Sequence, residues 1–269
     1  MLSGLAGDVL YTIRLLKKDP VFTLVAVLTL AVAIGANTTV FSVVEAILSF
    51  PFPVERPDRV TLVYGENPAR NLRREGVSVD DFLDWRDQSR SFDYLVAVAP
   101  TAFNVVAEGE PVRVSAARVT EGFFEMMGGS IFLGRAFRAE EARPGGDRVA
   151  VVTHGFWQRE LGGRQDVLGL ALPLDGVVHT VVGVAAPDFF FLPPTASLWT
   201  PLVLERGRAP RDDRSLFAIG RLREGARVEE ADAEVKTIAE RLATAYPDTN
   251  AGWSSRVITV RDNLNSSRE

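Results

Sequence analysis

The sequence predicts an α+β fold in which one N-terminal transmembrane helix precedes a mixed domain. Three observations predict it: a long apolar segment near the start, helix-and-strand patterns at residues 51–110 and 205–262, and a β-rich block at residues 111–204 between them. With 46% hydrophobic and 24% charged residues, the composition is that of a globular protein and excludes a disordered chain. The length of 269 residues corresponds to one or two domains.

The N-terminal apolar segment is long enough to cross a membrane. Val21–Ala36 carries no charge, and the extension to Phe50 adds a single acidic residue. A helix over this stretch would be about 45 Å long, whereas the hydrocarbon core of a bilayer is about 30 Å thick. Asp19 and Pro20 are typical of a helix start. We therefore predict a transmembrane helix with an emerging stalk at residues 19–50.

Two other interpretations of this segment stay open. A buried helix of a soluble domain would be unusually long. A cleaved signal peptide agrees with the small residues Ala31-Val32-Ala33, but the apolar run exceeds the usual length of about 7–15 residues. The uncleaved anchor is the interpretation we favour.

The residues before the anchor predict a helix that lies on the membrane surface. An interfacial amphipathic helix at residues 1–18 would place its apolar residues on one face: Leu2, Leu5, Val9, Ile13 and Leu16. Three basic residues (Arg14, Lys17 and Lys18) closely precede the predicted span and two follow it. This bias predicts a cytoplasmic N-terminus and an exported main domain.

Composition and missing motifs exclude several function classes. The net charge of −5 argues against a nucleic-acid partner, which would require a basic face. The absence of cysteine removes disulfides, thiol nucleophiles and zinc knuckles. None of the three lysines follows a glycine, so there is no Walker A motif, and no serine lies in a G-x-S-x-G elbow.

The main domain is predicted to alternate short strands and helices. Residues 66–76 are polar and rich in turn formers, which indicates a loop. The predicted strands are 59–64, 111–120, 148–153, 170–176, 179–186, 216–222 and 256–260. The predicted helices are 78–88, 123–127, 156–161 and 228–246, with Ser78 as the cap of the first and with Phe82 and Trp85 facing inward.

Two groups of polar residues are candidates for a site. The first is a carboxylate row on the helix at residues 78–88, formed by Asp80, Asp81, Asp84 and Asp87. Because Arg86 and Arg90 lie among them, we interpret the row as a solvated helix face rather than a metal site. The second is the pair of histidines, His154 and His179, which lack a carboxylate or histidine at ligand spacing.

The basic residues between Arg135 and Arg164 alternate with acidic ones, which indicates a mixed surface rather than a phosphate track. The sequence therefore predicts no catalytic, cofactor-binding or metal-binding residue, and no enzyme activity.

Four phrases of the sequence carry a family resemblance: RLLKKDPVFTLVAVLTLAVAIGANTTVFSVVEAIL, SVDDFLDWRDQSRSF, VVTHGFWQRELGG and GRLREGARVEEADAEVKTIAERLATAYPDTN. The chain resembles the N-terminal part of a MacB/FtsX-like ABC transporter permease, most closely the long MacB-like permeases of soil bacteria. The resemblance implies a periplasmic core domain with a porter-like subdomain in two parts (51–110 and 205–262), an inserted β-rich subdomain (111–204) and a tail (263–269).

The same resemblance implies a mechanism and partners. A separate cytoplasmic ABC ATPase would hydrolyse ATP, and the membrane helix would move the periplasmic domain, a process described as mechanotransmission. It also implies an inner-membrane location and pairing with a second permease copy or half, and it leaves the cargo open. Because the family carries further transmembrane helices after this domain, the chain is expected to be a fragment or a short form.

Two alternative functions stay open. One is a stand-alone, single-span binding module that keeps the exported domain of such a permease. The other is an exported hydrolase with a catalytic set around His154 or His179.

Overall fold

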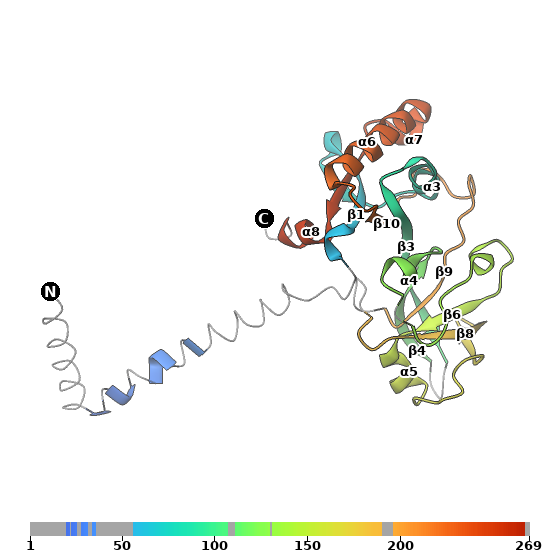
Figure 1. Ribbon diagram of the computed structural model, residues 1–269. Coiled ribbons are helices and arrows are strands. Elements are labelled where there is room, and N and C mark those ends of the chain that lie inside the picture. The colour runs from blue at the N-terminus through green and yellow to red at the C-terminus, as the bar shows by residue number, and fades with distance from the viewer. Residues whose placement is uncertain are drawn as a thin grey trace, which may run out of the picture. The chain divides into compact units, whose positions relative to one another are not determined.

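The computed structural model describes residues 20–21, 23–25, 28–31, 34–35, 56–106, 111–129, 131–189 and 196–266 (Figure 1). The chain divides into two units, Met1–Pro51 and Phe52–Glu269. In the first unit the described residues are helical, and their large apolar side chains are exposed, Val21 by 71% and Leu30 by 62%. The predicted helix at residues 1–18 and most of the predicted span at 19–50 lie outside the described residues. No helix in the described ranges combines the length and apolarity that a membrane crossing requires.

In the described part of the second unit, eleven strands form one mixed sheet. Nine of them follow the order β11-β1-β10-β3-β4-β9-β6-β8-β5, while β2 pairs with β1, and β7 pairs with β3 and β8. The strands are β1 (Val60–Asn67), β2 (Leu72–Glu75), β3 (Phe92–Val105), β4 (Val112–Val119), β5 (Ile131–Gly134), β6 (Val149–Val152), β7 (Ala171–Leu174), β8 (Val177–Ala185), β9 (Leu198–Pro201), β10 (Phe217–Leu222) and β11 (Ser254–Thr259).

Helices cover the sheet at separate places (Figure 1). Figure 1 places α3, α6 and α7 near β1 and β10, α4 beside β3, and α5 near β8. The α-helices are α3 (Val79–Gln88), α4 (Phe123–Met126), α5 (His154–Glu160), α6 (Val228–Ala245), α7 (Pro247–Asn250) and α8 (Val260–Ser266). Short 3-10 helices are η1 (Pro57–Arg59), η2 (Pro68–Arg70) and η3 (Ala139–Ala142).

Strand β3 joins the two ends of the sheet. Its first half pairs with β10 as far as Val98, and from there its second half pairs with β4. Pro100 lies just past the point where the pairing with β10 ends. A proline has no N–H to donate, so it is tolerated where a strand has lost one neighbour. Because a proline within a run of residues argues against a strand, the sequence did not predict β3.

Three clusters of buried side chains form the core. The first lies where α3 and α6 pack on the sheet, and it contains Phe82 and Trp85, which are 0% and 2% exposed. The inward orientation predicted for these two residues is therefore confirmed. The second cluster surrounds α4, and the third lies beneath α5. Each cluster buries several aromatic rings. Removing such apolar surface from water is the main contribution to the stability of the fold.

Most predicted elements agree with the structure, and two segments differ. Ser78 caps α3, because its Oγ accepts a hydrogen bond from the N–H of Asp81 at 3.2 Å. The loop predicted at residues 66–76 is wrong, because η2 and β2 lie within it and β2 pairs with β1 through Gly65 and Asn67. Residues 263–266, which were expected in a tail, belong to α8.

Candidate functional site

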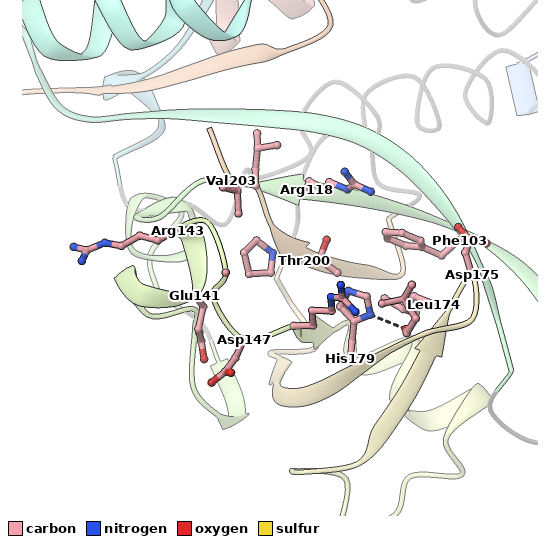
Figure 2. A pocket seen from close by; sticks show the side chains of 16 residues that line it. Phe103, Arg118, Glu141, Arg143, Asp147, Leu174, Asp175, His179, Thr200 and Val203 are labelled. Atoms are coloured by element: carbon pink, nitrogen blue, oxygen red, sulfur yellow. Dashed lines mark hydrogen bonds between the residues drawn. The ribbon is translucent and has the colours of Figure 1, made fainter. Parts of the chain in front are cut away.

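A surface cavity of about 460 Å³ lies in the β-rich part of the second unit (Figure 2). Its polar lining includes Arg118 from β4, Arg148 just before β6 and His179 from β8. Its apolar lining includes Phe103 from β3 and Leu174 from β7. We call this cavity the basic pocket. Its volume falls in the range of small-molecule sites, roughly 300–1,000 Å³.

The sheet register brings these residues together although they are far apart in the sequence. Arg118 is the Cα partner of Thr200 in the parallel β4–β9 pair, so both side chains line the same cavity. The N–H of Thr180 donates to the carbonyl of Arg148 at 2.8 Å, which holds Arg148 beside the strand that carries His179. The spacing of these residues along the chain gives no sign of this arrangement.

The cations of the basic pocket lack acidic partners. The guanidinium of Arg118 lies 5.9 Å from the centre of the Phe103 ring, at the distance of a weak cation–π contact. No carboxylate in the described ranges forms an ion pair with Arg118 or Arg148. Burial lowers the pKa of His179, and the charges of the two arginines lower it further. A hydrogen bond to the Val177 carbonyl has the opposite effect and raises the pKa, but by less. His179 is therefore a neutral polar group at pH 7.

Two of the three carboxylates that line the pocket are engaged by other groups. Glu141 accepts hydrogen bonds from Arg135 at 2.6 and 3.0 Å and from the N–H of Arg138 at 2.7 Å. Burial alone would raise the pKa of Glu141, but these hydrogen bonds hold it below its ordinary value. Asp175 accepts hydrogen bonds from the N–H and the side-chain amide of Asn104 at 2.9 and 2.7 Å. The third carboxylate, Asp147, precedes Arg148 in the chain and also lines the cavity. Among the described residues, none of the three forms an ion pair with Arg118 or Arg148.

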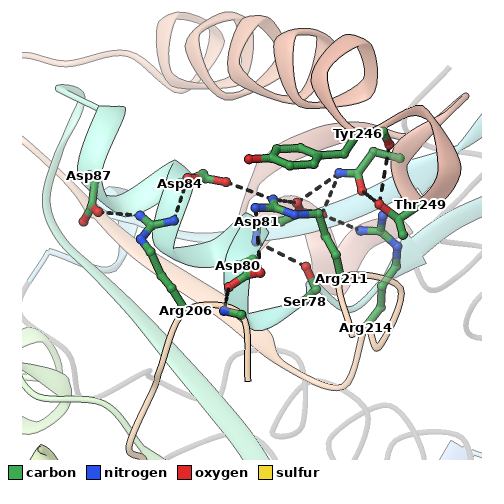
Figure 3. A network of polar contacts seen from close by, with 12 residues as sticks. Ser78, Asp80, Asp81, Asp84, Asp87, Arg206, Arg211, Arg214, Tyr246 and Thr249 are labelled. Carbon is green, nitrogen blue, oxygen red and sulfur yellow. Dashed lines mark hydrogen bonds and ion pairs between the residues drawn. The ribbon is translucent and has the colours of Figure 1, made fainter. Parts of the chain in front are cut away.

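A second polar cluster links α3 to the loop that precedes β10 (Figure 3). We call it the arginine–aspartate network, and it consists of Asp80, Asp81, Asp84, Asp87, Arg206, Arg211 and Arg214. These are the four carboxylates that the sequence indicated as a solvated helix face. That prediction is wrong for Asp80, Asp81 and Asp84, whose side chains are 13%, 3% and 15% exposed, whereas Asp87 is 48% exposed.

Asp81 is the centre of this network. Its oxygens accept hydrogen bonds from Arg211 at 2.6 Å and from Arg214 at 3.2 Å. The side-chain amide of Asn250 donates to both oxygens at 3.0 Å. Burial lowers the pKa of the Arg214 guanidinium even though Asp81 opposes the shift. Three donors thus compensate one buried carboxylate, as such a charge requires.

Two aromatic rings complete the network. The guanidinium of Arg211 stacks 3.9 Å from the ring centre of Tyr246, and that of Arg214 stacks 3.6 Å from the ring of Trp253. These contacts tie the loop to the end of α6 and to the segment before β11. The network is therefore a structural clamp between α3 and the C-terminal part of the sheet. In the part of the chain that the structure describes, no group of three His, Asp or Glu side chains is arranged to hold a metal ion.

The histidines occupy different environments. His154 packs against Phe132 and Trp157, with ring centres 5.4 and 5.2 Å away. His179 lines the basic pocket. Neither forms an ion pair with a described carboxylate. The arrangement that orients a histidine as a general base is therefore missing from the described residues.

The two ends of the domain lie side by side. Helix α8 contacts η1 and β1, and Figure 1 shows α8 next to the start of β1. Strands β1 and β11 pair antiparallel from Thr61↔Thr259 to Glu66↔Ser254. The hydroxyl of Tyr64 donates to the side-chain oxygen of Asn263 at 3.3 Å. The first and last described elements of the second unit, η1 and α8, are therefore in contact.

The comparisons with known proteins agree with this architecture. The model of the MacB-like periplasmic core domain matches residues 23–238. The periplasmic region of MacB from Actinobacillus actinomycetemcomitans superposes with a TM-score of 0.56 at 13% identity, covering 78% of this chain and 92% of that one. The extracellular domain of the ABC-type transporter YknZ from Gram-positive bacteria superposes with a TM-score of 0.55 at 14% identity, covering 74% and 99%. No curated protein sequence matches the chain.

At these identities the solved structures show a shared fold, and the family model carries the assignment. The matched range includes most of the described helical residues of the first unit, those from 23 to 35, and most of the sheet, together with the basic pocket and the arginine–aspartate network. The expected family resemblance is thereby confirmed. The chain belongs to the MacB/FtsX-like permease family and contains its MacB-like periplasmic core domain.

Proposed function

We propose that the chain is a permease component of an ABC transporter, anchored in the inner membrane by residues 19–50. Its N-terminus is cytoplasmic, and residues 56–266 form the exported domain. A separate cytoplasmic ATPase hydrolyses ATP and moves the anchor, and a second permease copy completes the transporter. The chain itself performs no catalytic step in this proposal.

The observation that carries the proposal is the position of the two ends of the domain. Because η1 and α8 lie together, a membrane segment before η1 and another after α8 would both attach at one edge of the sheet. A movement of the anchor would reach β1 and β11 directly, since η1 precedes one strand and α8 follows the other. A domain held at a single edge is suited to transmit such a movement.

The interior supports transmission as a rigid body. Strand β11 packs under α6, and the arginine–aspartate network fixes α3 to the loop before β10. Since packed cores and charge-assisted hydrogen bonds resist gradual deformation, a displacement of β1 and β11 would carry the adjacent helices with it. In this proposal the network therefore keeps α3 fixed to the sheet while the domain moves.

The experiment is purification of the tagged full chain from native membranes in a mild detergent. We expect an ATPase with a Walker A motif to copurify in a fixed ratio, and its ATP hydrolysis to change when the exported domain is deleted. A chain that elutes without any ATPase, or an ATPase that is insensitive to the deletion, would contradict the proposal.

A second function is favoured by the basic pocket. In this alternative the chain is a single-span, membrane-anchored binding module derived from such a permease, and the pocket holds its ligand outside the cytoplasm. Its expected result in the same purification is a membrane-bound chain near 29.4 kDa without an ATPase. On an immunoblot of native, untagged membranes, a band several-fold heavier would favour the transporter.

A further inference from the structure

The structure assigns the basic pocket as a binding site for an amphiphilic anion: a sulfonate, phosphate or carboxylate group on a flat apolar body. The inference concerns only the pocket, so it holds for either proposed function. Three observations carry it: cations without acidic partners, an adjoining apolar wall and a cavity of suitable volume.

The first observation concerns charge. Arg118 and Arg148 come from different parts of the sheet and both line the cavity. Figure 2 shows the carboxylates of Glu141 and Asp147 turned away from Arg118 and His179. Both residues are solvent-exposed, so their guanidinium groups are accessible to an anion that enters the cavity. Guanidinium groups are well suited to the task because they bind anionic oxygens with paired hydrogen bonds.

The second observation concerns the apolar wall. Phe103, Leu174 and Val177 line the same cavity, and the Phe103 ring lies 5.9 Å from the Arg118 guanidinium. A lone inorganic ion would leave this wall in contact with water. A ligand with an aromatic or short aliphatic body would cover the wall while its charged group reaches the arginines.

The third observation concerns volume and specificity. A cavity of about 460 Å³ admits a ligand larger than a single ion. Nδ1 of the neutral His179 ring donates to the Val177 carbonyl at 3.0 Å, so its Nε2 is left as a hydrogen-bond acceptor. The arginines therefore receive the anionic group, and Nε2 of His179 can accept a hydrogen bond from a donor elsewhere on the ligand.

The test uses 4-fluorobenzenesulfonate as the probe and fluorine NMR of the full chain in a neutral detergent as the readout. The probe stays a monoanion at every working pH, and neutral 4-fluorobenzenesulfonamide has nearly the same shape. We expect saturable binding of the sulfonate, with affinities at least about tenfold weaker for the sulfonamide and for inorganic sulfate. Absence of saturable binding, or equal affinity for either control compound, would overturn the inference.

Variants locate the binding. Arg118→Gln and Arg148→Gln are each expected to weaken sulfonate binding by about tenfold, and the double variant to abolish it. Arg143→Gln is the matched control, because Arg143 lines the same cavity but its guanidinium points away from His179 (Figure 2). We expect it to bind within about twofold of wild type. Unchanged binding in the double variant would place the probe elsewhere and refute the assignment.

Competition distinguishes two sources of the anion. Dihexanoylphosphatidylglycerol carries its phosphate on a lipid, whereas phenyl phosphate carries it on a soluble aromatic body. Displacement of the probe at lower lipid concentration assigns the site to a lipid head group, and displacement at lower phenyl phosphate concentration assigns it to a soluble anion. Failure of both compounds to displace the bound probe would contradict the proposed chemistry.

Discussion

Replacing Asp81 by asparagine is expected to destabilise the exported domain strongly. The side chain of Asp81 is 3% exposed and receives hydrogen bonds from Arg211, Arg214 and Asn250. Asparagine keeps the shape but removes the charge, so the side chain of Arg214, which is 9% exposed, loses its carboxylate partner. Leaving a buried charge unpaired in this way costs about 3–5 kcal/mol.

The structure places the expected loss at the lower end of that range. Arg211 also binds Asp84 at 2.9 Å and therefore keeps one carboxylate in the variant. We expect the free energy of unfolding to fall by about 3 kcal/mol. For a unit of this size that loss corresponds to a melting temperature lower by roughly 6–12 °C.

Urea unfolding of the full chain in mild detergent, followed by tryptophan fluorescence, measures this loss. One of the four tryptophans, Trp253, lies against the Arg214 guanidinium and contributes to this signal. Asp87→Asn is the matched control on the same helix, because Asp87 and its partner Arg206 are 48% and 47% exposed. Its expected cost is at most about 1 kcal/mol. If Asp81→Asn cost no more than Asp87→Asn, the network would not be the clamp described above.

Two further predictions concern other parts of the domain. His179→Gln should make the free energy of unfolding less dependent on pH. In the folded state, burial and the charges of Arg148 and Arg118 lower the pKa of His179. Wild type therefore loses stability as the pH falls below 6.5, the ordinary pKa of histidine. Urea unfolding at pH 7.5, 6 and 5 checks this, and equal slopes for variant and wild type would contradict it. Gly76→Ala should cost about 1–3 kcal/mol, because the added Cβ would lie 2.1 Å from the carbonyl oxygen of Arg214. An unchanged urea midpoint would show that the backbone moves aside freely.

Local patterns in the sequence predicted much of the fold. The Ser78 cap, the inward side chains Phe82 and Trp85 and the long helix α6 all follow from spacing within a few turns. Strand β3 was missed because Pro100 interrupts its pattern. The strand tolerates this proline only because its pairing with β10 ends just before it. That information lies more than 100 residues away in the chain.

The candidate sites were less predictable because their partners are distant in sequence. Asp81 is 130 residues from Arg211 and 169 from Asn250, so a helix that looks solvated in isolation is buried by a later loop. The four arginines at residues 206–214 were the available signal. The basic pocket likewise gathers Arg118 of β4, Arg148 just before β6 and His179 of β8, and only the sheet register brings them together.

The central claim is that the domain is exported while the N-terminus stays in the cytoplasm. The chain contains no cysteine, so single cysteines can be introduced and labelled without background. Arg241→Cys places a thiol on an exposed position of α6, and Ser3→Cys places one in the segment before the anchor.

A membrane-impermeant maleimide applied to intact spheroplasts tests the claim most directly. We expect Arg241→Cys to be labelled at once and Ser3→Cys only after the membrane is permeabilised. Protection of the Arg241→Cys thiol until permeabilisation would place the domain in the cytoplasm and contradict the account.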